Sequence, residues 1–303
     1  MIRIATLPMQ AAMRDLLVDQ GNALQDATMR KASGKRLSSF AELGADTGRN
    51  LATRTLLAQY EGQKVVLDRV DTALALYKTR LGEIDTAASS LRTVLLKGIG
   101  TGDIQSIMSE AEAAFGRFRE SINAADDGTL IFAGGRTDTP PLGPNRLSDM
   151  ATIDPATLFA NDDFRRSARL SDGYEMRYGI VASDFGQPFA TAFKILATLG
   201  PVGPDGKATR EQLDKMGQAR VAIDDGLKLL RTADANNGNS QARVDDIVSH
   251  LAERSDLLTK ALSDMEDADD GALSMEITTR DAMYKSSLAA FRMVNSVSLA
   301  DYL

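Results

Sequence analysis

Residues 51–96, LATRTLLAQYEGQKVVLDRVDTALALYKTRLGEIDTAASSLRTVLL, decide the fold class of this chain. Apolar side chains recur there in alternating steps of four and three residues, a 3.5-residue repeat that predicts a helix with one buried seam and left-handed supercoiling. Gln63 is the one fully polar member, and no proline interrupts the stretch. At 1.5 Å per residue the helix would be about 70 Å long. The seam positions are Leu56, Tyr60, Gln63, Leu67, Val70, Leu74, Tyr77, Leu81, Ile84, Ala88, Leu91 and Leu95.

A second segment with the same spacing lies near the other end of the chain and is the expected partner. It runs through Val244, Ile247, Leu251, Arg254, Leu258, Ala261 and Met265. Together the two segments predict a coiled-coil seam, for which we select Leu67, Val70, Leu74, Leu81, Ile84, Leu91, Leu95, Leu251 and Leu258. A shorter helix, 104–125, follows Gly98–Gly102 and is expected to return antiparallel to the first.

Between these helical segments the pattern changes to short strands. Residues 129–133 predict a strand before a glycine turn, and Asp172-Gly173 between two alternating runs predicts a β-hairpin over 164–180. A short helix with four apolar side chains on one face should cover that sheet (Phe185, Phe189, Phe193 and Leu196). Asn236-Asn237-Gly238-Asn239 is expected to interrupt or kink the later helix.

The order of segments is nearly palindromic, which predicts a mainly α fold: an elongated coiled-coil rod built from both chain ends, with a small α+β insert at its far end. We expect an assembly helix at 1–36, the N-terminal part of the rod with a short β-hairpin at 37–140 and the insert at 141–206. The C-terminal part of the rod follows at 207–270, and a second assembly helix at 271–303.

Each terminal helix carries an apolar stripe and has little of its own chain to cover it. We expect both stripes to be buried between copies, and a head-to-tail contact that does not close would build a helical tube. The expected interface residues are Met9, Met13, Leu16, Leu17, Leu24, Leu273, Ile277, Tyr284, Leu288, Phe291, Val294 and Leu299.

Composition argues against several functional classes. The chain has 303 residues, no Cys, no Trp, one His and 5% aromatic residues, so an aromatic-lined catalytic pocket and thiol chemistry are disfavoured. A net charge of −7 disfavours nucleic-acid binding. No apolar run is long enough to cross a membrane, and no secretory signal peptide is evident, which by these rules alone predicts a cytoplasmic protein.

No residue cluster predicts catalysis, a cofactor or a metal. His250 has no second His or Cys to act with and is expected on a helix surface. The acidic run 264–270 could bind a cation, but it lacks EF-hand spacing and is expected to be a solvated patch before the last helix. The basic cluster at 30–36 fits a helix C-terminus and a subunit contact better than nucleic acid or membrane. The glycines match no nucleotide-binding motif.

Four motifs resemble those of the bacterial flagellin family. Ser33-Gly34-Lys35-Arg36 is similar to the family's Ser-Gly-Lys-Arg, and Met265–Asp269 (Met-Glu-Asp-Ala-Asp) is similar to its Ile-Glu-Asp-Ala-Asp. The segment 130–141 (Leu-Ile-Phe-Ala-Gly-Gly-Arg-Thr-Asp-Thr-Pro-Pro) and the ending 298–303 (Ser-Leu-Ala-Asp-Tyr-Leu) resemble the branch that joins the flagellar hook to the filament. Residues 40–46 depart from the Asp-Asp or Asp-Asn-Pro that often stands there in the family.

The resemblance implies a structural subunit of the bacterial flagellum, exported through the flagellar type III apparatus and located outside the cell, which replaces the cytoplasmic expectation. It implies a homo-oligomer in a helical tube that contacts other axial proteins, namely hook-associated protein 1 and flagellin. A cytoplasmic export chaperone would hold the C-terminal helix before export, and no nucleic acid, membrane insertion or enzymatic activity is implied.

Two alternatives remain open at this point. The chain could be a flagellin subunit of the filament itself, because some filament subunits have equally small inserts. It could also be a cytoplasmic coiled-coil adaptor whose terminal helices bind partners, although such a protein would need no export.

Overall fold

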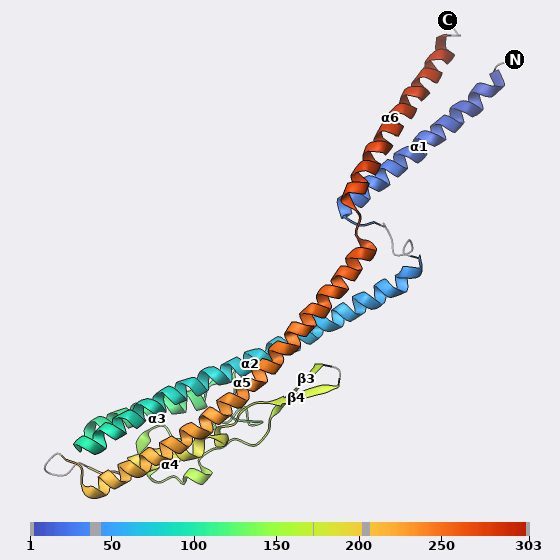
Figure 1. Cartoon of the computed structure of the whole chain (residues 1–303). Helices are drawn as coiled ribbons and strands as arrows, with labels where there is room; N and C mark the ends of the chain where they lie inside the picture. Colours follow the sequence, from blue (N-terminus) through green and yellow to red (C-terminus); the bar gives the residue numbers. More distant parts are fainter. Residues whose placement is uncertain (1–2, 37–43, 172, 202–206, 301–303) are drawn as a thin grey trace. The chain divides into compact units, whose positions relative to one another are not determined.

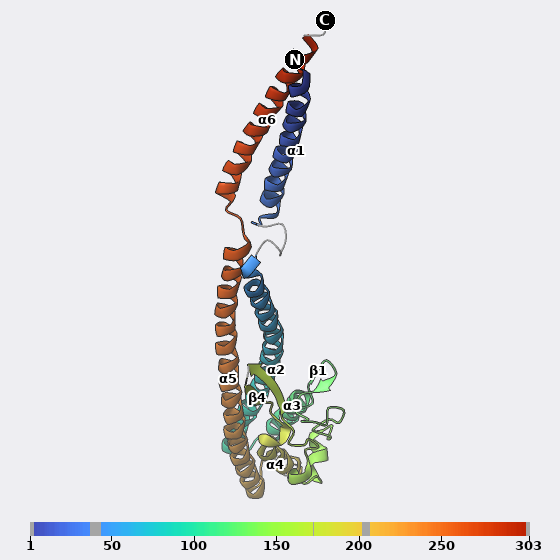
Figure 2. The same cartoon turned by 90° about the vertical axis from the view of Figure 1, so that its right-hand side faces the viewer.

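The computed structural model describes residues 3–36, 44–171, 173–201 and 207–300. It divides into two compact units, which we describe separately: Met1–Tyr60 with Ala252–Leu303, and Glu61–Leu251. Long helices make up most of both units, as the sequence predicts, and the strands are confined to the second (Figures 1 and 2). The predicted mainly α fold with a small α+β part is confirmed. The five domains expected from the sequence, with their bounds, stay predictions.

Helix α2 (Thr47–Thr101) is continuous and contains the whole 3.5-residue repeat. Seven seam side chains are at most 1% exposed: Leu67, Val70, Leu74, Leu81, Ile84, Leu91 and Leu95. On the partner segment Leu251 is buried and Leu258 is partly buried. Tyr77 and Ala88 are buried as well, so the repeat is buried without a gap from Leu67 to Leu95.

Two helices cover this seam in the second unit. Helix α3 (Ile104–Ile122) begins after a tight turn in which Gly102 has φ +74°. Its Ile107 lies so close to Gly98 that a Cβ at that position would overlap the isoleucine side chain. Gly102 thus allows the backbone conformation of the turn, and Gly98 allows the close approach of the two helices.

Helix α5 (Arg210–Glu266) is the second cover, and ion pairs show that it runs antiparallel to α2. Arg92 of α2 pairs with Asp224 of α5. Arg231 lies seven residues after Asp224 on α5, and it pairs with Asp85, which lies seven residues before Arg92 on α2. The Arg231 hydrogen bond is also the main cause that lowers the pKa of Asp85.

The expected interruption at 236–239 is wrong, because α5 is unbroken there. Asn237 is 4% exposed, and its side-chain Nδ2 donates to the main-chain oxygen of Leu74 at 2.8 Å. A favourable partner on α2 thus offsets the weak helix propensity of an Asn-Asn-Gly-Asn run, which tertiary packing routinely overrides.

The small α+β part contains two short hairpins. Strands β1 (Ala125–Asp126) and β2 (Thr129–Leu130) form one, and β3 (Arg166–Ser171) and β4 (Tyr174–Tyr178) form the other, with antiparallel pairing in both. The second hairpin turns at Gly173, φ +81°, as the Asp-Gly pair predicts; residue 172 itself lies outside the described residues.

Helix α4 (Gly186–Ala197) packs differently from the expectation that it covers the β-hairpin. It lies mainly against α3 and the 3-10 turns η2 (Leu147–Ala151), η3 (Pro155–Thr157) and η4 (Ala182–Asp184). The ring of Phe193 meets Phe115 edge-on at a centroid distance of 5.2 Å, and Phe189 lies over Phe118 and against Gly226 of α5. Two strands alone are too small to bury a helix face, whereas the α3 surface offers aromatic partners.

Candidate functional site

The terminal helices form a pair within one chain. Helix α1 (Arg3–Ser33) and helix α6 (Asp270–Ala300) run antiparallel, with both chain ends at the same end of the pair (Figures 1 and 2). Helix α1 contains Pro8 within its first two turns. Gly21 lies against Tyr284, so that a Cβ there would stand 3.5 Å from Cε2 of the ring.

Most of the expected interface residues face this partner helix. Among them Leu273 is buried, and seven more are partly buried: Met13, Leu17, Leu24, Ile277, Tyr284, Leu288 and Phe291. Ala27, on the same stripe of α1, is fully buried. The sequence indicates that one chain has little to cover these stripes; in the structure α1 and α6 cover each other in part, because their apolar stripes meet in an antiparallel pair.

Four of the predicted interface residues are placed otherwise. Met9 and Leu16 remain 51% and 49% exposed, so they lie on the flank of α1 and not in the seam with α6. The side chains of Val294 and Leu299 lie outside the described residues. The role of all twelve residues in contacts between copies stays a prediction.

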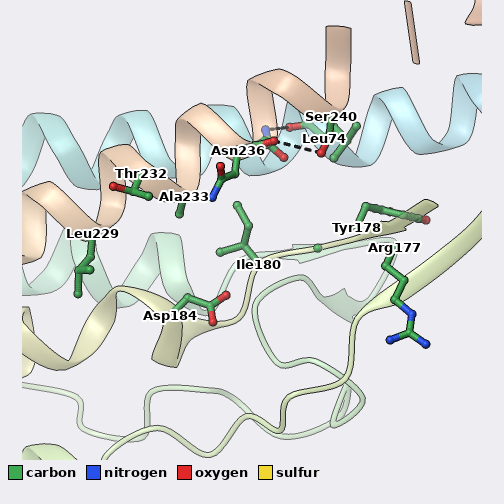
Figure 3. Close-up of a pocket in the computed structure, with 12 residues that line it drawn as sticks. Leu74, Arg177, Tyr178, Ile180, Asp184, Leu229, Thr232, Ala233, Asn236 and Ser240 are labelled. Atoms are coloured by element: carbon green, nitrogen blue, oxygen red, sulfur yellow. Dashed lines mark hydrogen bonds between the residues drawn. The ribbon is translucent and has the colours of Figure 1, made fainter. Parts of the chain in front are cut away.

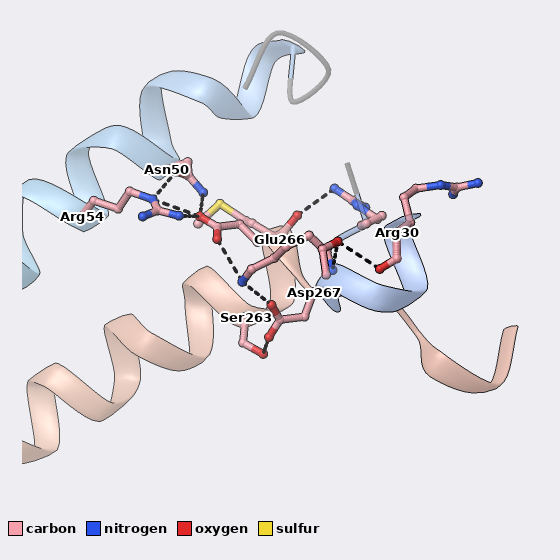
Figure 4. A network of polar contacts seen from close by, with 10 residues as sticks. Arg30, Asn50, Arg54, Ser263, Glu266 and Asp267 are labelled. Carbon is pink, nitrogen blue, oxygen red and sulfur yellow. Dashed lines mark hydrogen bonds and ion pairs between the residues drawn. The ribbon is translucent and has the colours of Figure 1, made fainter. Parts of the chain in front are cut away.

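A polar cluster, which we call the clasp, lies where α1 ends, α2 begins, α5 ends and α6 begins (Figure 4). It joins residues 30–36 and 50–54 to residues 263–276, all within the first unit. Two of the motifs that resemble the flagellin family, 33–36 and 265–269, are thereby in direct contact. Their main chains bond to each other: the Arg36 N–H donates to the Glu266 oxygen at 2.7 Å, and the Ala268 N–H donates to the Gly34 oxygen at 3.0 Å.

Glu266 is the centre of the clasp. Its Oε1 accepts from Asn50 Nδ2 and from Arg54 Nη2, each at 2.6 Å, and Lys35 Nζ lies 3.3 Å from Oε2. The Glu266 side chain is only 11% exposed, so these contacts are partly shielded from water. The Asn50 hydrogen bond, followed by those of Arg54 and Lys35, holds the pKa of the Glu266 carboxyl below its usual value.

Four of the five acidic residues in the run 264–270 are exposed, as the sequence suggests, but three members of the run are also bound to basic residues. Lys35 Nζ lies 2.6 Å from Asp267 Oδ1, and this hydrogen bond is the main cause that raises the Lys35 pKa and lowers the Asp267 pKa. Lys31 pairs with Asp270 at 3.1 Å. The basic cluster at 30–36 thus contacts the other end of its own chain, where the sequence suggested a contact between subunits.

The clasp continues into the terminal pair through an ion pair. Arg30 Nη2 lies 3.2 Å from Glu276 Oε1, and Arg280 contacts the same carboxylate at 2.7 Å. The Arg280 hydrogen bond is the main cause that lowers the Glu276 pKa. Ion pairs across the two helices fix which residues of α1 and α6 stand opposite each other.

Sequence reasoning missed Asn50 and Arg54, which hold Glu266. A signal was present, because the buried Asn50 and Thr53 are polar residues in the stretch just before the apolar repeat of α2. Polar residues that replace apolar ones on a coiled-coil stripe often bind a specific partner and fix the register. The connection 37–43, part of which departs from the family pattern, lies outside the described residues.

The described residues offer little for catalysis. A hollow of about 330 Å³ lies between α5 and the segment 177–184, lined by Arg177, Tyr178, Asp184 and Asn236 among others (Figure 3). Asp184 is already bound to Arg165 at 2.8 Å. Across the described ranges, no three His, Cys, Asp or Glu side chains gather as metal ligands would, and no helix is long and apolar enough to span a membrane. His250 lies on the exposed surface of α5, as expected.

Comparison with known proteins links the chain to flagellar proteins. Residues 221–303 match the model of the bacterial flagellin C-terminal helical region. The fold is similar to a putative flagellar hook-associated protein from Vibrio parahaemolyticus (TM-score 0.63, 18% identity), covering 75% of this chain and 100% of that one. It is also similar to FlgL from Bacillus cereus (TM-score 0.59, 13% identity), covering 70% of this chain and 98% of that one. For FlgL from Xanthomonas campestris the TM-score is 0.57 at 11% identity, with coverage of 70% and 99%. No curated protein matches the chain.

Proposed function

We propose that this chain, whose residues 221–303 match the flagellin C-terminal helical region, is a structural subunit of the bacterial flagellum that joins the hook to the filament. The observation that carries the proposal is the clasp between residues 33–36 and 265–269. It brings together two motifs of flagellin character and leads directly into the paired terminal helices. The function is structural: the clasp and the helix pair hold the two ends of the chain together, and no group of described residues is arranged for chemistry on a substrate.

The fold supports the hook-associated branch. The similar solved structures cited above are described as hook-associated protein or FlgL, and this chain covers nearly their whole length. In this function the protein is exported through the flagellar type III apparatus and stands outside the cell. Its terminal helices assemble into a helical tube with further copies, with hook-associated protein 1 on one side and flagellin on the other. Before export, a chaperone holds the C-terminal helix.

Immunogold labelling of flagella tests the location. A band at the distal edge of the hook is expected. Labelling along the whole filament would instead favour the filament flagellin, the second candidate, which the match of residues 221–303 to the flagellin C-terminal region supports. Protein found only in the cytosol would contradict both and leave a cytoplasmic adaptor.

Truncation tests the role of the terminal helices. Deletion of residues 1–30 or of residues 275–303 is expected to leave the second unit folded, because its core does not include α1 or α6. The shortened chains should be soluble and should not join flagella. Truncated chains that still enter the junction would overturn the assembly role given to these helices.

A further inference from the structure

The methionines of this chain divide into an exposed group and a buried group. Every methionine whose described side chain is exposed lies on α1 or α6; Met275 is 73% exposed and Met283 is 55% exposed. In the second unit Met150 and Met216 are fully buried. The thioethers of the terminal pair are thus open to small molecules in water, whereas those of the core are not. The exposed group consists of Met9, Met29, Met275, Met283 and Met293.

The composition of the chain directs oxidants to methionine. Cysteine and methionine are the two side chains whose sulfur hydroperoxides oxidise, and this chain has 12 methionines and no cysteine. A cysteine thiolate therefore cannot take up the oxidant in place of a thioether. Exposure then decides which thioether reacts, because the peroxide must reach the sulfur atom.

Met283 stands in a setting that accommodates the oxidised form of its side chain. It lines a hollow of about 540 Å³ together with Gln20 of α1 and the hydroxyl side chains of Ser286 and Ser287. The hollow has room for one more oxygen atom on the sulfur. A sulfoxide oxygen accepts hydrogen bonds, and the serine hydroxyls that line the same hollow are donors.

We propose that the terminal pair is the oxidation site of this protein: hydroperoxides convert the thioethers of Met275 and Met283 to sulfoxides, while Met150 and Met216 remain reduced. A lone pair of the methionine sulfur attacks the terminal peroxide oxygen, so that an S–O bond forms and the O–O bond breaks. The sulfur loses two electrons to the peroxide. The proton of the attacked oxygen passes to the second oxygen, which leaves as water from hydrogen peroxide or as an alcohol from an organic hydroperoxide. The inference goes beyond the proposed function and concerns the chain before assembly covers its terminal helices.

Oxidation at these positions changes the surface of the terminal pair without opening the fold. A sulfoxide is polar, whereas the thioether is apolar and flexible. Because Met275 and Met283 face water, the added oxygen displaces no packed side chain. A sulfoxide at Met216 would instead bring a polar group into the apolar core of the second unit, which is costly. The change at the surface is also reversible, because methionine sulfoxide reductases restore the thioether.

Peptide mapping of the full-length chain after brief exposure to hydrogen peroxide tests the site. Met275 and Met283 are expected to gain one oxygen atom at least about tenfold faster than Met150 and Met216, as measured by mass spectrometry of the digested chain. In urea the four rates should become equal within about twofold, because unfolding exposes every thioether. Equal rates for Met275 and Met216 in the folded chain would overturn the inference.

The melting temperature separates oxidation of the surface from damage to the core. After the brief treatment the wild type should melt at its original temperature. The double variant Met275→Leu/Met283→Leu is the matched control, because leucine keeps the side-chain volume. It should lose the oxygen uptake at these two positions, while Met9 and Met29 still react. The two methionine sulfoxide reductases, one for each sulfoxide epimer, should return the oxidised peptides to their original mass.

Two further results would count against the inference. One is a lower melting temperature of the oxidised wild type while its core methionines are still reduced, since the sulfoxides would then disturb the fold. The other is a set of sulfoxides at Met275 and Met283 that the reductases leave unchanged in the folded chain, since these side chains would then not be accessible.

Discussion

Asn237 on α5 donates its side-chain amide to the main-chain oxygen of Leu74 on α2, across 163 residues of sequence and at 2.8 Å. The asparagine is 4% exposed and Leu74 is 1% exposed, so this polar contact lies inside an apolar seam. A buried polar residue in a helix pair penalises any other register, because a shift would leave its amide unpaired.

Asn237→Ala should therefore destabilise the second unit by about 1–3 kcal/mol, the cost of removing one partner of a buried hydrogen bond. Thermal or urea unfolding followed by circular dichroism measures the change. Asn239→Ala is the control, because Asn239 is exposed two residues later and alanine favours the helix there. Equal unfolding curves for the two variants would contradict the role given to Asn237.

Leu74→Asp should destabilise the same unit by at least about 3 kcal/mol, since it removes a buried leucine and buries an unpaired charge. Val65 on the same helix is 59% exposed, so the free energy of unfolding of Val65→Asp should stay within about 0.5 kcal/mol of the wild-type value. An unchanged melting curve for Leu74→Asp would show that the seam is not buried in solution.

Alanine substitutions at two glycines of α5 should change the free energy of unfolding in opposite directions. A Cβ at Gly226 would stand 2.8 Å from the ring of Phe189, whereas a Cβ at Gly217 meets nothing within 4 Å. Gly217→Ala should stabilise the protein by about 0.5–1 kcal/mol through helix propensity. Gly226→Ala gains the same propensity but forces the phenyl ring aside, and a net loss of about 1–2 kcal/mol is expected. Equal melting temperatures would mean that α4 does not pack on α5 as described.

The clasp predicts a pH dependence. The pKa of Glu266 is lowered from 4.5 in the folded protein, so its ionised form is the one that folding favours. Its contribution to stability is present above about pH 4.5 and is lost as pH falls through the lower folded pKa. Glu266→Gln should cost about 1–3 kcal/mol at pH 7, because charged hydrogen bonds to Asn50 and Arg54 are weakened, and the difference from the wild type should shrink below pH 4.

Asp264→Asn is the matched control for this experiment, since Asp264 is an exposed carboxylate two residues away from Glu266. Unfolding is compared at pH 7 and pH 3.5 for the wild type and both variants. A deficit of Glu266→Gln that is as large at pH 3.5 as at pH 7 would show that the charge of Glu266 does not hold the clasp.

Local patterns in the sequence predicted much of the fold. The 3.5-residue repeat located α2 and its seam, and the Asp172-Gly173 pair located the β3–β4 hairpin, because both features depend on residues that are neighbours in sequence. The Asn-rich run 236–239 failed as a helix breaker for the opposite reason. The helix continues through this run with Asn237 bonded to the main-chain carbonyl group of Leu74, a partner that no local pattern reveals.

The candidate site shows the same division. The spacing of apolar residues in the sequence predicts the stripes of α1 and α6 but not that they cover each other, because spacing identifies a buried side without identifying what buries it. Likewise the motifs at 33–36 and 265–269 were found separately, and their contact through Lys35 and Asp267 was not foreseen.

The sequence by itself determined most of the helices, their buried sides and the resemblance of both ends to flagellin motifs. The tertiary structure alone decided which helix meets which, that Glu266 is held by Asn50 and Arg54, and which side of the terminal pair stays open. The physical reason is the separation of the interacting residues along the sequence. Helical periodicity depends on residues within a few positions of one another, whereas contacts between residues some two hundred positions apart depend on packing and paired charge in the folded chain.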